Sequence, residues 1–156
     1  MAQATLLGCK AYTKGEVPIG AVIVKNDKVI ATAMNRREKH QIATHHAEIL
    51  AIEKACKKLH SWRLDECTLF VTLEPCPMCA GAILNARIKK VVYAVKDENS
   101  GAISKFDMLN NTLNHTTISE YDKTYEEENK TLIQNFFKNK RKIQKNNKKL
   151  KNNNIF

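Results

Sequence analysis

Residues 66–86 read ECTLFVTLEPCPMCAGAILNA, and this stretch decides the fold. The apolar run at residues 66–73 predicts a short buried strand. Residues 77–86 predict a helix, with Pro77 well placed in its first turn. Residues 90–95, KVVYAV, predict the next strand. A strand, a helix and a strand therefore follow one another, and two cysteines, Cys76 and Cys79, stand where the first strand gives way to the helix.

The flanking segments complete the predicted fold. Further helices are predicted at residues 2–14, 47–59 and 121–142. Further strands are predicted at residues 19–25, 28–33 and 116–118, the first two forming a hairpin that turns at Asn26 and Asp27. Residues 34–44 are polar and irregular and predict a loop. This order predicts an α/β protein of three layers, α/β/α, in which helices flank a mixed sheet of about five strands.

The helix predicted at residues 47–59 is amphipathic. Its larger apolar residues recur at helical spacing, at Ile49, Ile52, Cys56 and Leu59. Lysines occupy the other side, so the pattern predicts that this helix packs its apolar face on the sheet.

Charge is distributed unevenly along the 156 residues, a length suited to one domain. The net charge is +10, and residues 138–156 carry +8 of it, with eight basic residues and no acidic one. We predict a single domain at residues 1–142 and a basic, Asn- and Lys-rich tail at residues 143–156 that need not be ordered. Two interpretations of the tail stay open: it binds nucleic-acid phosphates, or it is a solvated extension.

The cysteines and the N-terminus bear on the compartment. The sequence has no apolar run near the roughly 20 residues that span a bilayer, and its start lacks the charged-then-apolar order of a signal peptide. We therefore expect a cytoplasmic protein without membrane contact. Five cysteines, an odd number, argue against a disulfide framework, and the Cys-x-x-Cys pair indicates metal or redox chemistry.

Two short segments carry the candidate chemistry, HAE at residues 46–48 and PCPMC at residues 75–79. One helical turn separates Cys76 from Cys79, so both sulfurs lie on one side, at the helix end whose dipole favours thiolates. His46 and Glu48 flank another helix start, where the backbone is not yet regular and both can reach one site.

An imidazole and two thiolates form a zinc set that is one ligand short. Structural zinc is normally closed by four protein ligands, whereas catalytic zinc keeps a position for water. Other histidines lack a supporting spacing, namely His40, His45 and His60. The set therefore favours a catalytic Zn²⁺, one per chain, and no organic cofactor is expected.

Glu48 then has a task as catalytic residue. Zinc lowers the pKa of a bound water, and a neighbouring carboxylate serves as the base that deprotonates it. The same carboxyl returns the proton to a ring nitrogen and then to a leaving amine. This is hydrolytic deamination, and the combination of HxE and PCxxC is a recorded signature of nucleobase deaminases.

With these motifs in place, the sequence resembles the bacterial tRNA-specific adenosine deaminases, a family within the cytidine-deaminase-like zinc fold. The resemblance runs over residues 15–142, and VTLEPCPMCAGA at residues 71–82 is its most specific part. It implies that His46, Cys76 and Cys79 bind zinc and that Glu48 shuttles protons. The implied reaction converts the wobble-position adenosine of a tRNA anticodon to inosine with release of ammonia.

The resemblance also implies substrate-binding residues and partners. Asn35 would hydrogen-bond the flipped base, Asp97 would contact the ribose-phosphate of neighbouring nucleotides, and Phe137 with the basic residues after it would cradle the loop. The partners would be a tRNA anticodon stem-loop and a second copy of the chain, in a homodimer. The sequence departs from the family pattern between residues 101 and 114, where it reads one residue shorter.

Three alternatives stay open at this stage. A free nucleobase or nucleotide deaminase, of guanine or cytosine type, would share the zinc signature without needing a basic surface. A non-catalytic, zinc-stabilised RNA-binding module would have no use for Glu48. A thioredoxin-like redox protein would use Cys76 and Cys79 but leave His46 and Glu48 unexplained.

Overall fold

The computed structural model describes residues 1–110 and 115–153, with side chains up to Lys148. Its elements follow in the order α1 (Ala2–Thr13), β1 (Gly20–Lys25), β2 (Lys28–Met34), α2 (Arg37–His40), α3 (Ala47–Leu59), β3 (Cys67–Val71), α4 (Pro77–Asn85), β4 (Lys90–Tyr93), β5 (Ile118–Tyr121), the 3₁₀ turn η1 (Lys123–Tyr125) and α5 (Glu126–Asn153). None of the helices in this described part is long and apolar enough to cross a membrane.

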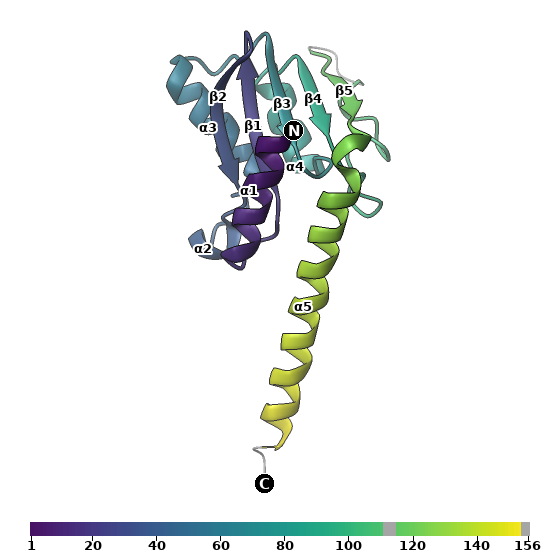
Figure 1. Cartoon of the computed structure of the whole chain (residues 1–156). Helices are drawn as coiled ribbons and strands as arrows, with labels where there is room; N and C mark the ends of the chain where they lie inside the picture. The colour runs from purple at the N-terminus through teal and green to yellow at the C-terminus, as the bar shows by residue number, and fades with distance from the viewer. Residues whose placement is uncertain (111–114, 154–156) are drawn as a thin grey trace.

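The sheet has five strands in the order β2-β1-β3-β4-β5 (Figure 1). Strand β1 pairs antiparallel with both β2 and β3, whereas β3–β4 and β4–β5 are parallel. The β1–β2 hairpin turns through Asn26 and Asp27, both with positive φ (49° and 58°). Two such residues form the two-residue turn whose twist suits a hairpin. The predicted mixed sheet and its hairpin are thus confirmed.

Helices cover both faces of the sheet (Figure 1). Helix α1 packs on one face so closely that a Cβ at Gly20 would lie 2.0 Å from the Ala4 carbonyl oxygen, which is why β1 begins with glycine. Helix α3 packs on the other face against β1 and β2 and contacts α4. Because α3 and α4 share this face, their first residues are brought toward one another.

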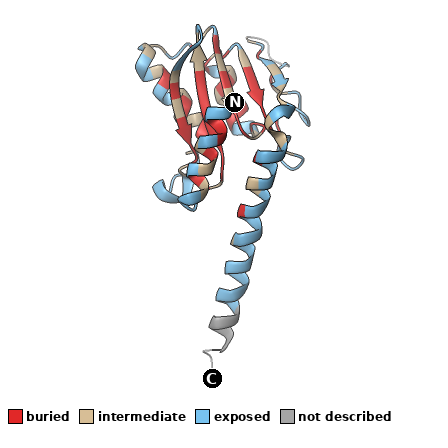
Figure 2. Ribbon diagram, in the orientation of Figure 1, coloured by how far each residue is buried: buried red, intermediate tan, exposed pale blue. Residues whose placement is uncertain are grey.

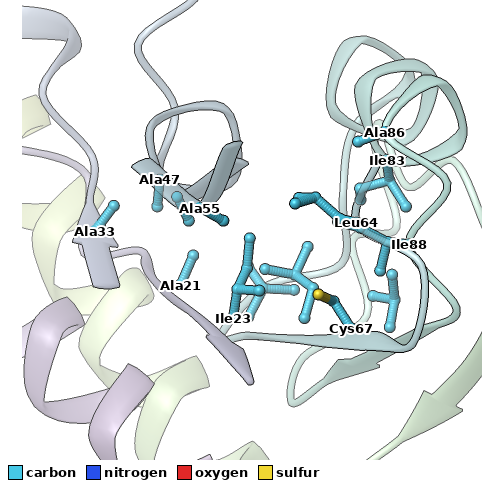
Figure 3. Packing of buried hydrophobic residues seen from close by; sticks show 14 of the residues in the cluster. Ala21, Ile23, Ala33, Ala47, Ala55, Leu64, Cys67, Ile83, Ala86 and Ile88 are labelled. Carbon is cyan, nitrogen blue, oxygen red and sulfur yellow. The ribbon is translucent and has the colours of Figure 1, made fainter. Parts of the chain in front are cut away.

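Small side chains set the distance between α3 and the sheet. The fully buried apolar residues of α3 are alanines one turn apart, Ala47, Ala51 and Ala55. Figure 3 shows Ala47 and Ala55 lying close to Ala21 and Ile23 of β1. The predicted apolar residues Ile52, Cys56 and Leu59 pack against the core as well but are only partly buried, so the alanine row forms the fully buried face.

Helix α5 differs from its prediction at both ends. It begins at Glu126 and runs through residue 142 to Asn153, where the sequence predicted a helix over residues 121–142 and a separate tail. The first turns dock on α1, where Asn129 Nδ2 donates to Thr5 Oγ1 at 3.0 Å. Residues 141–148 are exposed, and the helix extends away from the domain (Figures 1 and 2). Residues 154–156 of the predicted tail lie outside the described residues.

The remaining differences are local. The region predicted as a loop at residues 34–44 contains one turn of helix, α2. The last strand covers Ile118–Tyr121 instead of residues 116–118. Four of the residues in the shortened segment that precedes it, 111–114, lie outside the described part.

Candidate functional site

Two helix starts carry the site. His46 is the N-cap residue of α3 and Cys76 that of α4, both with extended backbone (ψ 158° and 169°). Extended geometry at an N-cap turns the side chain off the helix axis before the helical repeat begins. Pro77 supplies the first position of α4 without losing an intrahelical hydrogen bond. Cys79 follows in the first turn of α4 and is fully buried.

The structure brings His46, Cys76 and Cys79 together. Their ligand atoms all lie within 4.8 Å of one another, and this is the one such group among the described residues. His46 Nδ1 lies 3.8 Å from Cys76 Sγ and 3.6 Å from Cys79 Sγ. Ligands of tetrahedral zinc, with bonds of about 2.0–2.3 Å, are roughly 3.5–3.8 Å apart. The donor set and its spacing therefore fit zinc, with one coordination position left over.

The two thiols are electrostatically distinct. A hydrogen bond from Cys79 and another from His46 lower the pKa of Cys76 to about 4. The same bond to Cys76, together with burial, raises the pKa of Cys79. The bond with Cys76 also raises the pKa of His46. Cys76 is therefore a thiolate at neutral pH, whereas Cys79 holds a proton that a metal ion would displace.

Glu48 lies beside this group in the first turn of α3. Only 3% of it is exposed, and its buried Oε2 has no hydrogen-bond partner in the described part of the chain. Burial raises the pKa of its carboxyl group above the ordinary value. A buried carboxyl oxygen without a partner is costly, so its presence points to a substrate or water that completes it. A carboxyl with a raised pKa is suited to both taking up and releasing a proton.

Asn35 is buried at the end of β2, where its side chain is fixed by a residue far away in the sequence. Its Nδ2 donates to Glu16 Oε2 at 3.0 Å, and Glu16 is itself only 1% exposed. The next residue, Arg36, donates its backbone N–H to the His45 carbonyl at 3.1 Å. This bond ties the strand end that carries Asn35 to the residue before His46.

Glu74 organises the segment after β4. Its buried carboxylate accepts from the backbone N–H groups of Asp97, Ile103 and Ser104 at 2.6–3.0 Å, and from Ser104 Oγ at 3.0 Å. Gly101 lies so close that an added Cβ would be 2.5 Å from the Glu74 carboxylate. Because Glu74 stands two residues before Cys76, it couples this loop to the segment that carries Cys76 and Cys79.

Asp97 shapes its own loop. Its Oδ1 accepts from the backbone N–H of Asn99 and of Ser100, and its Oδ2 accepts from Ser100 Oγ at 2.6 Å. Burial acts to raise the pKa of Asp97, but these hydrogen bonds outweigh it and leave the pKa below its ordinary value. Asp97 therefore carries a negative charge and fixes the loop that holds it.

Asp97 and Phe137 line one cavity of about 630 Å³ between this loop and α5. His46, Cys76 and Cys79 are not among the residues that line it. Phe137 is 40% exposed, whereas Phe136 is buried edge-to-face on Tyr12, with ring centroids 6.0 Å apart. A second hollow continues along α5 past Lys138 and Arg141. An exposed aromatic ring beside cations is a surface suited to a single-stranded nucleic acid.

The seven predicted site residues thus fall into three places. His46, Cys76, Cys79 and Glu48 form one group. Asn35 is connected to this group through the backbone hydrogen bond between Arg36 and His45. Asp97 and Phe137 line a separate cavity. None of the other candidate histidines belongs to the described metal group: the Nδ1 atoms of His40 and His45 lie 2.7 Å apart, and His60 ends α3. The buried carboxylates Glu16 and Glu74 were missed as functional supports, because their hydrogen-bond partners lie 19–30 residues away in the sequence.

A mixed five-stranded sheet whose helix starts present His, Cys and Cys beside a buried glutamate defines the class of nucleobase deaminases. Residues 1–141 match the family model of the MafB19-like deaminases. The chain belongs to this deaminase family.

Individual relatives agree with this. The tRNA-specific adenosine deaminase of Aquifex aeolicus is 44% identical over 131 residues, which cover 83% of this chain and 85% of that protein. That of Bacillus subtilis is 56% identical over 92 residues, which cover 59% of this chain and 57% of the relative.

Solved structures agree as well. A structure from a study of A-to-I editing by tRNA:A34 deaminases superposes with a TM-score of 0.80 at 37% identity, covering 85% of this chain and 96% of that chain. Guanine deaminase from Bacillus subtilis superposes with a TM-score of 0.60, also at 37% identity, covering 78% of this chain and 81% of that chain.

Proposed function

We propose that this deaminase converts the wobble-position adenosine of a tRNA anticodon loop to inosine. The chemistry rests on one observation above all: the buried, unpartnered Oε2 of Glu48 beside the His46-Cys76-Cys79 group. The substrate is supported by relatives that are tRNA-specific adenosine deaminases and by the tRNA:A34 deaminase structure.

His46, Cys76 and Cys79 would hold one Zn²⁺ through Nδ1 and the two Sγ atoms. When bound, zinc supplies the Lewis acidity that makes water a nucleophile near neutral pH. The three residues supply two negative charges and a neutral imidazole, which leaves one position of a tetrahedron for the reacting group.

Glu48 would move every proton of the reaction. It takes a proton from the attacking water as the oxygen bonds to C6 of adenine, and it delivers that proton to N1. It then takes the proton of the new hydroxyl group and delivers it to the amino group, so that the C6–N bond breaks and ammonia leaves. Water and adenosine are consumed, inosine and ammonia are formed, and Glu48 returns to its starting state.

The surrounding residues would select and hold the substrate. Asn35, fixed by Glu16, would hydrogen-bond the flipped base. The Asp97 loop and Phe137 would receive neighbouring nucleotides, since they line one cavity next to the basic part of α5. The proposal includes a homodimer and a cytoplasmic location, where tRNA is found.

Guanine deamination is the second candidate, because guanine deaminase from Bacillus subtilis shares the fold at 37% identity. A free base needs no positive surface. The hollow that runs along α5 past Lys138 and Arg141 therefore favours an RNA substrate.

A parallel assay distinguishes the candidates. Purified zinc-loaded protein is offered an anticodon stem-loop RNA with A at the wobble position, the same RNA with G there, free adenosine, free guanine and cytidine. We expect inosine only in the A-containing RNA. If the protein deaminates free guanine or cytidine and forms no inosine in the RNA, its function is instead the deamination of free bases or nucleosides.

A further inference from the structure

A third cavity, of about 350 Å³, lies at the β2 edge of the sheet. It is lined by Leu7 and Lys10 of α1, Thr32, Ala33 and Met34 of β2, Arg36, Lys39 and His40 around α2, and Leu50 and Lys54 of α3. The lining contains three lysines, one arginine and one histidine, and no acidic residue. A hollow with this lining repels cations and attracts anions.

The guanidinium group of Arg36, which lines this cavity, has a nitrogen atom without a hydrogen-bond acceptor in the described structure. This atom is Nη1, and it is buried. Guanidinium N–H groups that are removed from water are nearly always paired, most often with carboxylate or phosphate oxygens that match their planar fork. The unpaired Nη1 of this lining residue is therefore a donor that an oxygen-bearing anion would satisfy.

The nearby carboxylates do not supply that anion. Glu16 accepts from Asn35 and from the backbone N–H groups of Glu38 and Lys39. The carboxylate of Glu38 pairs with Arg37 and Lys140. None of the ion pairs among residues 1–110 and 115–148 includes a cationic residue of this cavity.

Lys54 is held at the rim. Its Nζ donates to the Thr32 carbonyl oxygen at 2.8 Å, which fixes the ammonium group without neutralising it. Two of its protons remain to be donated to another acceptor. Arg36 and Lys54 thus line the same cavity from different elements, Arg36 from the segment after β2 and Lys54 from α3.

We infer that this cavity binds a phosphate group, with Arg36 and Lys54 as its principal donors. A phosphate accepts several charge-assisted hydrogen bonds at once, including a bidentate pair from arginine. Leu7 and Leu50 provide an apolar wall for the organic part of a phosphate ester. The phosphate belongs either to the RNA substrate or to a free nucleotide, and only the first source rests on the proposed function.

The RNA source has structural support. The backbone bond from Arg36 to His45 places this cavity next to the segment that leads into the zinc-ligand residue His46. An RNA strand that inserts one nucleotide into the site could therefore lay another of its phosphates here.

Binding measurements on the full chain test the inference. Affinities for the anticodon stem-loop RNA, for adenosine 5′-monophosphate and for inorganic phosphate are measured with the parent protein, Arg36→Gln and Lys54→Gln. Arg63→Gln is the matched control, because it removes the same charge from an exposed arginine that pairs with Asp65. Thermal melting of each variant verifies folding, and Lys54→Gln keeps the test decisive if Arg36→Gln does not fold.

We expect both cavity variants, and not the control, to bind at least one of the phosphate ligands about tenfold more weakly, the loss of one charge-assisted hydrogen bond. If only the affinity for the RNA falls, and the number of counterions released on RNA binding falls by about one, the cavity binds a phosphate of the RNA backbone. A loss for the mononucleotide or inorganic phosphate identifies a free ligand, and that result stands even if the protein binds no RNA. Unchanged affinities for all three ligands in both cavity variants would overturn the inference.

Discussion

The side chain of Asn35 donates from Nδ2 to Glu16 Oε2 over 3.0 Å, and both residues are buried. Glu16 lies before β1 and Asn35 lies after β2, so the hairpin brings the pair together across 19 positions. The carboxylate also accepts from the backbone of Glu38 and Lys39, which begin the path to His46. The residue proposed to hold the base is thus oriented by a carboxylate that touches no substrate.

Glu16→Gln tests this positioning role. The amide has one acceptor oxygen where the carboxylate has two, so it cannot accept both from Asn35 Nδ2 on one side and from the Lys39 N–H on the other. We expect KM for the stem-loop RNA to rise about tenfold, the cost of one misplaced hydrogen bond, while kcat changes less and bound zinc stays stoichiometric. The exposed Glu53→Gln serves as control. A fall in kcat with an unchanged KM would contradict this role.

Glu74→Ala is expected to reduce stability strongly. The substitution leaves three backbone N–H groups and the Ser104 hydroxyl without their acceptor. We expect the free energy of unfolding to fall by about 2–4 kcal/mol in a denaturant titration. The matched control is Glu66→Ala, since Glu66 pairs with Lys89 on the surface and exposed pairs contribute about 0–1 kcal/mol. Equal losses in the two variants would show that the loop does not depend on Glu74.

Zinc binding to the apoprotein should release protons in a predictable number. The pKa of Cys76 is lowered to about 4, so this thiol is already ionised at pH 7. Cys79 has a raised pKa and must lose one proton, and His46, whose pKa is also raised, loses a further fraction. We expect about one to two protons per zinc at pH 7, measured by calorimetry in buffers of different ionisation enthalpy. Release of no proton would contradict the assignment of Cys79 as a ligand.

The same pKa values set the pH dependence of the apoprotein. The lowered pKa of Cys76 stabilises the fold fully above about pH 9, and this contribution is lost as the pH falls toward 4. The raised pKa of Cys79 stabilises the fold below about pH 9, and this contribution is lost as the pH rises above that. Because one bond between the two thiols contributes to both shifts, we expect Cys76→Ser to flatten the acid side of the stability profile and part of the alkaline side. Cys79→Ser should flatten chiefly the alkaline side, since a serine hydroxyl can still donate to Cys76. The reverse pattern in urea titrations would exchange the roles of the two thiols.

Removal of residues 145–156 separates the two interpretations of the tail. Residues 141–148 are exposed, so we expect the melting temperature to change by less than about 2 °C. If the tail binds phosphates, each lysine removed should lower the slope of log affinity against log salt by about 0.7–0.9. A control protein with Lys28, Lys57 and Lys58 changed to Gln loses charge elsewhere. An unchanged slope after truncation would identify a solvated extension.

Much of the fold followed from local sequence signals. Asn26 and Asp27 take the positive φ values that their place in a two-residue turn predicts, and Pro77 begins α4 as predicted. The helix at residues 47–59 has the predicted bounds. These features depend on neighbours within a few positions, which is why a single sequence suffices to predict them.

The features that were missed depend on distant partners. Glu16 and Glu74 look like ordinary surface carboxylates in the sequence, but loops 20–30 residues away bury them. The alanine row of α3 becomes the buried face because β1 and β2 approach closely, which helical spacing of larger residues does not reveal. Helix α5 continues past residue 142 through an Asn- and Lys-rich segment that contains no proline or glycine to end it.

The central claim is that Glu48 moves the protons of a deamination at the His46-Cys76-Cys79 group, and one measurement tests it most directly. Zinc content and inosine formation in an A-wobble stem-loop RNA are determined side by side for the parent protein and Glu48→Gln. The account predicts one zinc per chain in both, unchanged RNA affinity, and a kcat lowered by about 10²–10⁴ in the variant. A variant that retains zinc and forms inosine at the parent rate would contradict it.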